Sequence, residues 1–202
     1  MKIVVISNES QKKELEGSLD SNNKNIHWVS SPDQLNLDAE VIIDLLFDET
    51  PDHLAVLKSY SSQLIMINSV VNTLKESDPS FVRINGWNGF LEKNSIEAAG
   101  NAENRAKASD ALAVFNKTIE WVPDIPGFIS PRVISMIINE AFLSLQEGVS
   151  TKDEINTAMK LGTNYPLGPF EWVDRIGAQK VKALLTRLSV MDNKYSPAAN
   201  LG

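Results

Sequence analysis

The chain has 202 residues, of which 43% are hydrophobic, and it carries a net charge of −7 at pH 7. This length allows one domain of ordinary size or two small ones, and the acidic balance argues against a broad nucleic-acid interface, which needs clustered Lys and Arg. The sequence holds no cysteine, which excludes disulfides, thiol nucleophiles and thiolate metal sites.

The N-terminus combines one lysine with a short apolar run, which predicts a buried strand rather than a signal peptide. No apolar stretch approaches the roughly 20 residues that a membrane-spanning helix needs. Two histidines and scattered acids give no metal-binding constellation. We therefore expect no metal, no nucleic-acid partner and no membrane partner, and a cytoplasmic location is the default.

Apolar strands alternate with helices along residues 1–123. Strands are predicted at residues 2–6, 25–29, 40–46, 63–68, 81–84 and 118–122, helices at 10–16, 52–60 and 102–116, and a short helical or loop crossover at 31–37. Such alternation is typical of a parallel sheet with helices on both faces. Right-handed crossovers then make a Rossmann-like sheet the economical topology.

Residues 124–202 follow a helical pattern instead. From about Ser130, apolar residues at spacings of three and four predict a long helix that ends near Gly148. Val133, Met136 and Leu143 widen its apolar stripe. We therefore expect this helix to be covered by its own domain and by a neighbour or a second subunit.

Two shorter helices are predicted next. Thr151–Glu154 has capping-box spacing and opens a helix that is expected to stop at Gly162. Pro169 occupies the favoured first position of another helix, which Gly177 ends. The tail at residues 193–202 is expected to be loose.

The stretch from Pro126 to Gly177 carries a family resemblance. It contains Pro126-Gly127-Phe128-Ile129, Arg132, Asn139-Glu140, Ala158-Met159-Lys160-Leu161-Gly162, Tyr165-Pro166, Gly168-Pro169-Phe170-Glu171 and Asp174. This string closely resembles the C-terminal domain of L-3-hydroxyacyl-CoA dehydrogenases; an unrelated stack of helical hairpins with similar caps is the alternative. The resemblance implies an NAD-binding-like α/β domain at residues 1–123, a helical domain at 124–202 that closes an acyl-CoA cleft, and a homodimer formed through the helical domain.

NAD binding is implied by the resemblance, but the expected glycines are missing. A dinucleotide site needs glycines in the first strand-to-helix turn, so that the backbone can approach the pyrophosphate. Here residues 6–12 contain none, and Glu9 adds a negative charge. The candidate cofactor-binding residues are Ser7, Asn8 and Ser10, with Asp33 a poor candidate for the ribose. The alternative is an ordinary turn with an N-cap. The α/β part is also shorter than the family's by several tens of residues.

The family reaction uses a histidine as base, oriented by a glutamate twelve residues later. The similar segment here is Asn85-Gly86-Trp87-Asn88-Gly89, and Glu97 follows Asn85 at that spacing. An amide cannot accept a proton near neutral pH, and loss of a general base typically costs about 10²–10⁴ in rate. Asn85 and Glu97 are the candidate catalytic residues. The alternative for Glu97 is a solvated helix residue.

Two further family positions have changed. Val70, in Asn68-Ser69-Val70-Val71, stands where the resemblance implies a substrate-contacting serine, and Pro131 stands where it implies an asparagine. The candidate substrate-cleft residues are Asn68, Ser69, Asn88 and Arg132. His27 is interpreted as a packed or edge residue. His53 is interpreted as a surface residue, or alternatively as a substitute base.

Three functions remain open at this stage. The first is a family member that has lost dehydrogenase chemistry and keeps a binding or structural role, with weak or no oxidation of 3-hydroxyacyl-CoA. The second is an NAD-dependent 3-hydroxyacyl-CoA dehydrogenase of fatty-acid metabolism with an altered site. The third is an interaction module without a small-molecule ligand.

Overall fold

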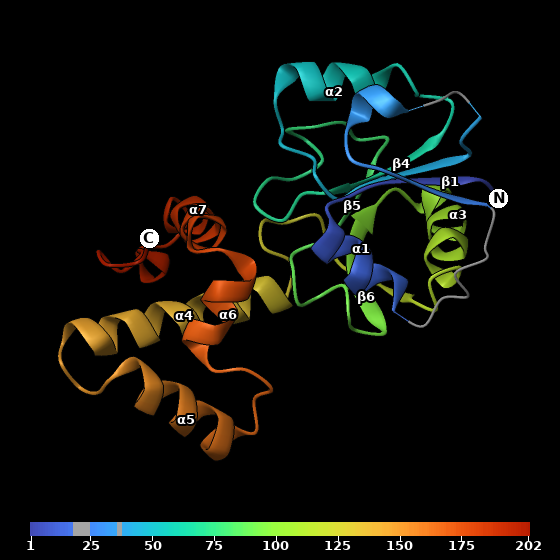
Figure 1. Cartoon of the computed structure of the whole chain (residues 1–202). Coiled ribbons are helices and arrows are strands. Elements are labelled where there is room, and N and C mark those ends of the chain that lie inside the picture. Colours follow the sequence, from blue (N-terminus) through green and yellow to red (C-terminus); the bar gives the residue numbers. More distant parts are fainter. Residues whose placement is uncertain (18–24, 36–37) are drawn as a thin grey trace. The chain divides into compact units, whose positions relative to one another are not determined.

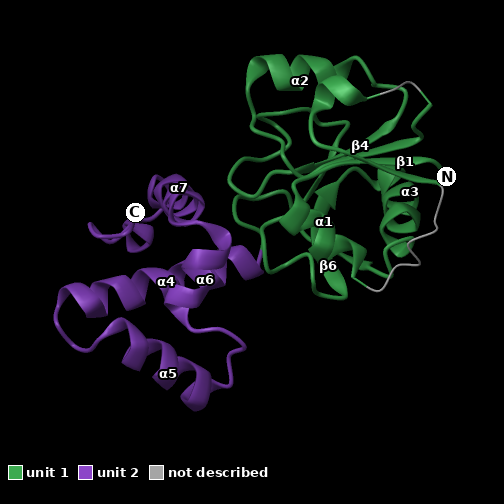
Figure 2. Cartoon of the chain, in the orientation of Figure 1, with its two compact units in different colours: residues 1–128 green, residues 129–202 purple. Residues whose placement is uncertain are grey.

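The structure, a computed structural model, describes residues 1–17, 25–35 and 38–202 (Figure 1). They form two compact units, Met1–Phe128 and Ile129–Gly202 (Figure 2). The domain boundary between residues 123 and 124 stays a prediction. The part of the predicted 31–37 crossover at residues 36 and 37 lies outside the described residues; before it, Pro32–Gln34 form a 3₁₀ turn, η1.

The described part of unit 1 contains a seven-stranded sheet in the order β2-β1-β3-β4-β5-β6-β7. The strands are β1 (Ile3–Ile6), β2 (Ile26–Val29), β3 (Val41–Asp44), β4 (Leu64–Asn68), β5 (Val82–Ile84), β6 (Ser95–Gly100) and β7 (Thr118–Trp121). Neighbouring strands from β2 to β5 are parallel, which confirms the Rossmann-like α/β prediction for this part of the sheet.

Strand β6 was not predicted, and it changes the character of the sheet. It runs antiparallel to β5 and parallel to β7, so the expectation of an all-parallel sheet is wrong at this end. A parallel connection needs a crossover of a dozen or more residues, usually with a helix. The segment from residue 85 to residue 94 is shorter and contains no helix, so the chain can only turn back beside β5.

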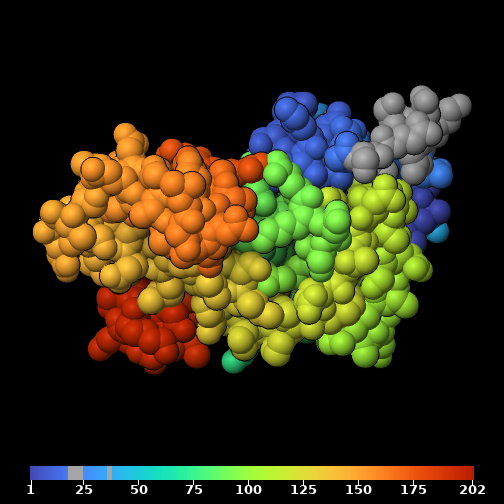
Figure 3. All heavy atoms as spheres, turned by 90° about the horizontal axis from the view of Figure 1, so that it is seen from below, coloured from blue at the N-terminus to red at the C-terminus, as the bar shows by residue number. Residues whose placement is uncertain are grey.

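Helices cover both faces of the sheet because successive strand residues point to opposite sides. Ile3 and Val5 of β1 pack with Leu15 of α1 (Glu9–Glu16) and with the apolar face of α3 (Ala102–Ala113). Viewed from below, α1 in blue and α3 in yellow-green lie on this face (Figure 3). Val4 and Ile6 pack on the other face with Leu57 of α2 (Pro51–Lys58).

Unit 2 is helical. Its helices are α4 (Ser130–Gln146), α5 (Lys152–Thr163), α6 (Pro169–Ile176) and α7 (Ala178–Ser189). Thr151 caps α5 in the predicted capping box. The predicted stop at Gly162 is wrong, because α5 continues to Thr163 and ends where Asn164 takes a left-handed conformation. Pro169 and Gly177 bound α6 as predicted.

The C-terminal tail is packed, so its prediction as loose is wrong. A 3₁₀ turn, η2, spans Asn193–Tyr195, and the side chains of Ala198 and Leu201 are buried. Asn139 of α4 holds the tail at both polar ends of its amide. Its Oδ1 accepts from the Ala198 N–H at 2.7 Å, and its Nδ2 donates to the Ser196 carbonyl at 3.0 Å. Across the described residues, no helix is long and apolar enough to span a bilayer.

Candidate functional site

The candidate site of unit 1 lies where β1, β3, β4 and β5 end. The segments at residues 7–11, 45–50, 68–72 and 85–89 include or follow the ends of these strands, and we call them together the sheet edge. Ligands of open α/β sheets bind outside the carboxyl ends of the strands, at a point where the strand order reverses. Here that point lies between β1 and β3, because β1 has β2 on one side and β3 on the other.

The two candidate catalytic residues are adjacent. Asn85 follows β5 and Glu97 lies in β6, and the Asn85 N–H donates to the Glu97 carbonyl at 2.9 Å. The Asn85 Nδ2 donates to the Glu97 Oε2 at 3.3 Å. Glu97 is only 9% exposed, so the interpretation of a solvated helix residue is wrong. The family's spacing of twelve thus gives a real side-chain contact, but the member that should carry a proton is an amide.

The start of α1 is closed by its own capping box. The Asn8 Oδ1 accepts from the Gln11 N–H at 2.9 Å, and the Asn8 N–H donates to the Gln11 Oε1 at 3.3 Å. Ser7 is buried at the end of β1. Ser10 accepts a hydrogen bond from the Asn88 Nδ2 at 2.9 Å, so two residues predicted for cofactor and substrate bind each other.

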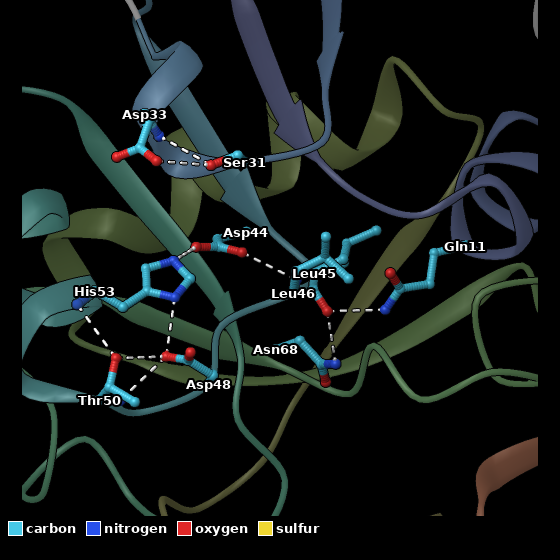
Figure 4. Close-up of polar contacts among 10 residues, drawn as sticks. All are labelled: Gln11, Ser31, Asp33, Asp44, Leu45, Leu46, Asp48, Thr50, His53 and Asn68. Carbon is cyan, nitrogen blue, oxygen red and sulfur yellow. Dashed lines mark hydrogen bonds and ion pairs between the residues drawn. The ribbon is translucent and has the colours of Figure 1, made fainter.

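Gln11, which the sequence analysis did not single out, spans the switch point (Figure 4). Its side chain is 1% exposed, and its Nε2 donates to the Leu45 carbonyl at 2.8 Å. The Asn68 Nδ2 donates to the same carbonyl at 3.1 Å, and the Asn68 Oδ1 accepts from the Gly86 N–H at 3.0 Å. The spacing of Asn8 and Gln11, which suits a capping box, is the signal that would have identified Gln11.

This network engages groups that a dinucleotide would need for binding. A pyrophosphate at a helix N-terminus takes its hydrogen bonds from the first backbone N–H groups of the helix. Two N–H groups at the start of α1, those of Asn8 and Gln11, already donate within the capping box. The buried amide of Gln11 lies against the Leu45 carbonyl, on the β3 side of the switch point.

The second candidate cluster surrounds the end of β4. Ser69 is 2% exposed, and its Oγ donates to the Glu49 Oε1 at 2.7 Å. The Asn72 Nδ2 donates to the other oxygen of the same carboxylate. Val70 is buried, at 2% exposure. Ser69 is therefore engaged within the protein, and its predicted role toward a substrate stays a prediction.

Arg83 of β5 is a buried cation that the sequence analysis also missed. Its side chain is fully buried, its Nε contacts the Asp124 Oδ1 at 2.5 Å, and its guanidinium lies 4.1 Å from the centre of the Phe128 ring. It also donates to the carbonyls of Ser69, Asn72 and Ile125. Its position inside an apolar strand was the signal available in the sequence. Arg83 ties the loop after β4 to the segment that ends unit 1.

His53 is not a surface residue, so that interpretation is wrong. It lies in the first turn of α2 at 9% exposure (Figure 4). Its Nε2 is 2.5 Å from the Asp44 Oδ2, and its Nδ1 is 3.0 Å from the Asp48 Oδ1. The hydrogen bond to Asp44 raises the pKa of His53, against the opposing effect of burial. With both ring nitrogens engaged, His53 has no free lone pair to act as a base. His27 is exposed on β2, the outermost strand on that side of the sheet, as interpreted.

The remaining candidate, Arg132, lies in α4 of unit 2. It is half-buried, and its guanidinium lies 5.8 Å from the centre of the Tyr195 ring. Pro131 occupies the first turn of α4, as the sequence suggested. Among the residues that the structure describes, no group of three or more His, Asp or Glu side chains is arranged to hold a metal ion.

Comparison with known proteins supports the resemblance. Residues 127–200 match the family model of the 3-hydroxyacyl-CoA dehydrogenase C-terminal domain. The helical unit therefore belongs to the family of 3-hydroxyacyl-CoA dehydrogenase C-terminal domains.

The curated relatives agree with this assignment. The 3-hydroxyadipyl-CoA dehydrogenase of Escherichia coli (strain K12) is 41% identical over 97 residues, which cover 47% of this chain and 20% of the relative. The mitochondrial hydroxyacyl-coenzyme A dehydrogenase of Sus scrofa is 31% identical over 145 residues, covering 67% of this chain and 46% of the relative. The chain thus spans less than half the length of either relative.

Solved structures show the fold. FadB2 from M. tuberculosis matches with a TM-score of 0.78 at 11% identity, over 99% of this chain and 91% of that protein. The (S)-3-hydroxybutyryl-CoA dehydrogenase from Ralstonia eutropha matches with a TM-score of 0.71 at 24% identity, over 86% of this chain and 67% of that one. The fold is therefore that of the family, with a Rossmann-like sheet and a helical C-terminal unit.

Proposed function

We propose that this chain is a 3-hydroxyacyl-CoA dehydrogenase family member that does not oxidise 3-hydroxyacyl-CoA with NAD, and that it serves a binding or structural role. The observation that supports this proposal most strongly is the contact between Asn85 and Glu97. The glutamate that would orient a catalytic base is in place and contacts residue 85 at 3.3 Å, but that residue is an amide. An amide cannot take up the 3-hydroxyl proton.

The sheet edge supports the same proposal from the cofactor side. The residues present do not fit a dinucleotide held in the Rossmann manner. Asn8 and Gln11 use their own N–H groups in the capping box, and the Gln11 side chain is bound to the Leu45 carbonyl. Glu9 adds a negative charge in the first turn of α1. A cofactor phosphate could use these two N–H groups only if the capping box were broken.

An active enzyme with an altered site is the second candidate, because the Glu97 carboxylate keeps its contact with residue 85. Changing Asn85 to His tests both candidates in one assay. Oxidation of NADH by acetoacetyl-CoA would be followed by absorbance for the wild type, for Asn85→His and for Asn85→Gln as a control without a base. The proposal predicts no turnover for all three proteins.

The altered-site candidate predicts a different pattern. If NAD binds and only the base is missing, Asn85→His should exceed Asn85→Gln by about 10²–10⁴ in rate. Turnover by the wild type itself would also contradict the proposal. Glu97→Gln would then be the next variant, since it removes the carboxylate that orients residue 85.

We further propose a homodimer formed through the helical unit, with an acyl-CoA as the candidate small ligand. Ile129 and Val133, one before and one within the first turn of α4, are 55% and 50% exposed, and Met136, one turn further, is half-buried. A partner would bury this apolar face. Light scattering of the wild type and of Val133→Glu tests it. The proposal predicts a dimer for the wild type and a monomer for the variant, and a monomeric wild type would contradict it.

A further inference from the structure

His53 and its two carboxylates form a charged cluster that the proposed function does not use (Figure 4). His53 and Asp44 are buried, whereas Asp48 is exposed. Asp44 ends β3 and is fully buried, Asp48 lies in the loop that follows, and the imidazole lies between them. The ring also packs edge-on against Phe47, at 5.2 Å between centroids. The cluster therefore joins β3 to the first turn of α2 across the loop at residues 45–50, which we call the latch segment.

The two contacts of the ring require its charged form. A neutral imidazole has one N–H donor and one lone pair, whereas the imidazolium has two donors. With a carboxylate at each nitrogen, only the imidazolium donates to both. The neutral ring would turn a lone pair toward one of the carboxylates. Proton loss therefore breaks one side of the cluster.

The latch segment is held by contacts at both ends. The Asp44 Oδ1 accepts from the Leu46 N–H at 2.9 Å, and the Asp48 Oδ1 accepts from the Thr50 N–H at 3.1 Å. Between them, Glu49 has a φ of 63°, a left-handed conformation that a residue with a side chain rarely adopts unless its surroundings hold it there. These contacts therefore hold residues 45–50 in their present conformation.

The same segment carries contacts of the sheet edge. The Leu45 carbonyl accepts from Gln11 and Asn68, and the Glu49 carboxylate accepts from Ser69 and Asn72. Displacement of residues 45–50 would therefore release the side chains that fill the switch point. We propose that His53 is a pH-sensitive latch, whose imidazolium holds the latch segment closed over the sheet edge and whose deprotonation releases it.

The charges around His53 determine the direction. Besides Asp44 and Asp48, the neighbouring η1 turn contributes Asp33, whose carboxylate binds Ser31, and α2 itself contributes Asp52. The contacts with Asp44 and Asp48 favour the imidazolium. The pKa of His53 is accordingly raised above 6.5, chiefly by the hydrogen bond to Asp44. The latch is therefore closed at pH values below the raised pKa of His53 and opens as pH rises through that pKa.

The two histidines of the chain provide a test with an internal control. Histidine NMR signals of the wild type would be followed from about pH 5 to about pH 9, a range that covers the ordinary histidine pKa. Amide hydrogen exchange of residues 45–50 would be measured over the same range and corrected for its intrinsic pH dependence. His53 should titrate above the ordinary histidine pKa.

Protection of residues 45–50 should fall about tenfold for each unit by which the pKa of His53 exceeds its unfolded value. His53→Gln should remove this pH dependence and His27→Gln should keep it. Titration of His53 at or below the ordinary histidine pKa, or unchanged protection while His53 loses its proton, would overturn the proposal. Neither of these outcomes needs a variant, so the test stands even if His53→Gln fails to fold.

Discussion

The helical unit and the sheet edge differ in which residues of the 3-hydroxyacyl-CoA dehydrogenase pattern they share. In the helical unit, the residues that carry the resemblance bind one another. Lys160 contacts the Glu171 Oε1 at 2.5 Å, and the Glu171 Oε2 accepts from the Gly168 N–H at 2.7 Å. These contacts join α5 to the start of α6. The retained identities therefore hold the fold and are not by themselves evidence of chemistry.

At the sheet edge the fold is kept, but the residues that the resemblance implies for chemistry are not. The apolar strands keep the sheet, while polar residues at the strand ends are bound to the protein itself, as in the contacts of Gln11 with Leu45 and of Ser69 with Glu49. Because the similarity to the family is strongest in the helical unit, it is evidence of a shared fold and not by itself of a shared activity. The candidate catalytic and cofactor-binding residues lie in the other unit, where they differ from the pattern that the resemblance implies. Four predictions test this difference between the two units, in order of decreasing expected effect.

The largest effect is expected for Arg83→Met, because the buried guanidinium serves several carbonyls and Asp124. Loss of these contacts should reduce the free energy of unfolding by about 3 kcal/mol, since the acceptors it leaves remain partly buried. Urea unfolding followed by circular dichroism measures it. Lys58→Met is the control, because the exposed Lys58–Asp78 pair at 3.5 Å should contribute below about 1 kcal/mol. Equal effects for the two variants would contradict the assignment.

In the helical unit, two glycines should respond in opposite directions. A Cβ at Gly168 would lie 2.6 Å from the Asn156 Cα, so Gly168→Ala should destabilise by about 2 kcal/mol. A Cβ at Gly162 meets nothing within 4 Å, and this residue lies inside α5, so Gly162→Ala should stabilise by about 0.5–1 kcal/mol. Thermal unfolding of both variants decides this. If Gly168→Ala left stability unchanged, lack of space for a side chain would not explain the glycine at this position.

Gln11→Ala tests whether the sheet edge is held by its own polar network. The variant removes a buried donor from the Leu45 carbonyl, which keeps its hydrogen bond from Asn68, and should cost about 1–2 kcal/mol. The exposed Gln179 of α7 provides the control, and Gln179→Ala should change stability by less than about 0.5 kcal/mol. No loss for Gln11→Ala would indicate an edge that is open to ligands.

The smallest effect concerns pH and follows from the raised pKa of His53. The folded state binds this proton more tightly than the unfolded state, so the stabilisation is complete below the unfolded pKa of about 6.5. It is lost as pH rises through the folded pKa. Urea midpoints measured on either side of neutrality should therefore show a steeper alkaline decrease for the wild type than for His53→Gln. Parallel curves would remove His53 as the cause.

Much of the fold followed from pattern, and the misses have physical causes. Apolar runs such as Ile3–Ile6 and helix caps such as Thr151 are local signals, so the sequence alone was sufficient to place these elements. Strand β6 contains Glu97 between small residues, and its pairing depends on the short return from β5 rather than on its own composition.

The site was harder to predict because its contacts join distant parts of the chain. The pairing of Asn85 with Glu97 could be anticipated from a family spacing. The Gln11–Leu45 and Arg83–Asp124 contacts link residues 34 and 41 positions apart, and a single sequence carries no sign of such pairings. His53 looked exposed because its helix start is polar; only the fold places Asp44 beside it.

If the sheet edge does not accept NAD, calorimetric titration of the wild type with NADH should give no heat of binding. A later addition of acetoacetyl-CoA to the same cell shows separately whether an acyl-CoA binds. Saturable NADH binding, accompanied by loss of NADH absorbance in proportion to protein once acetoacetyl-CoA is added, would contradict the loss of the NAD site and indicate a dehydrogenase with an altered site.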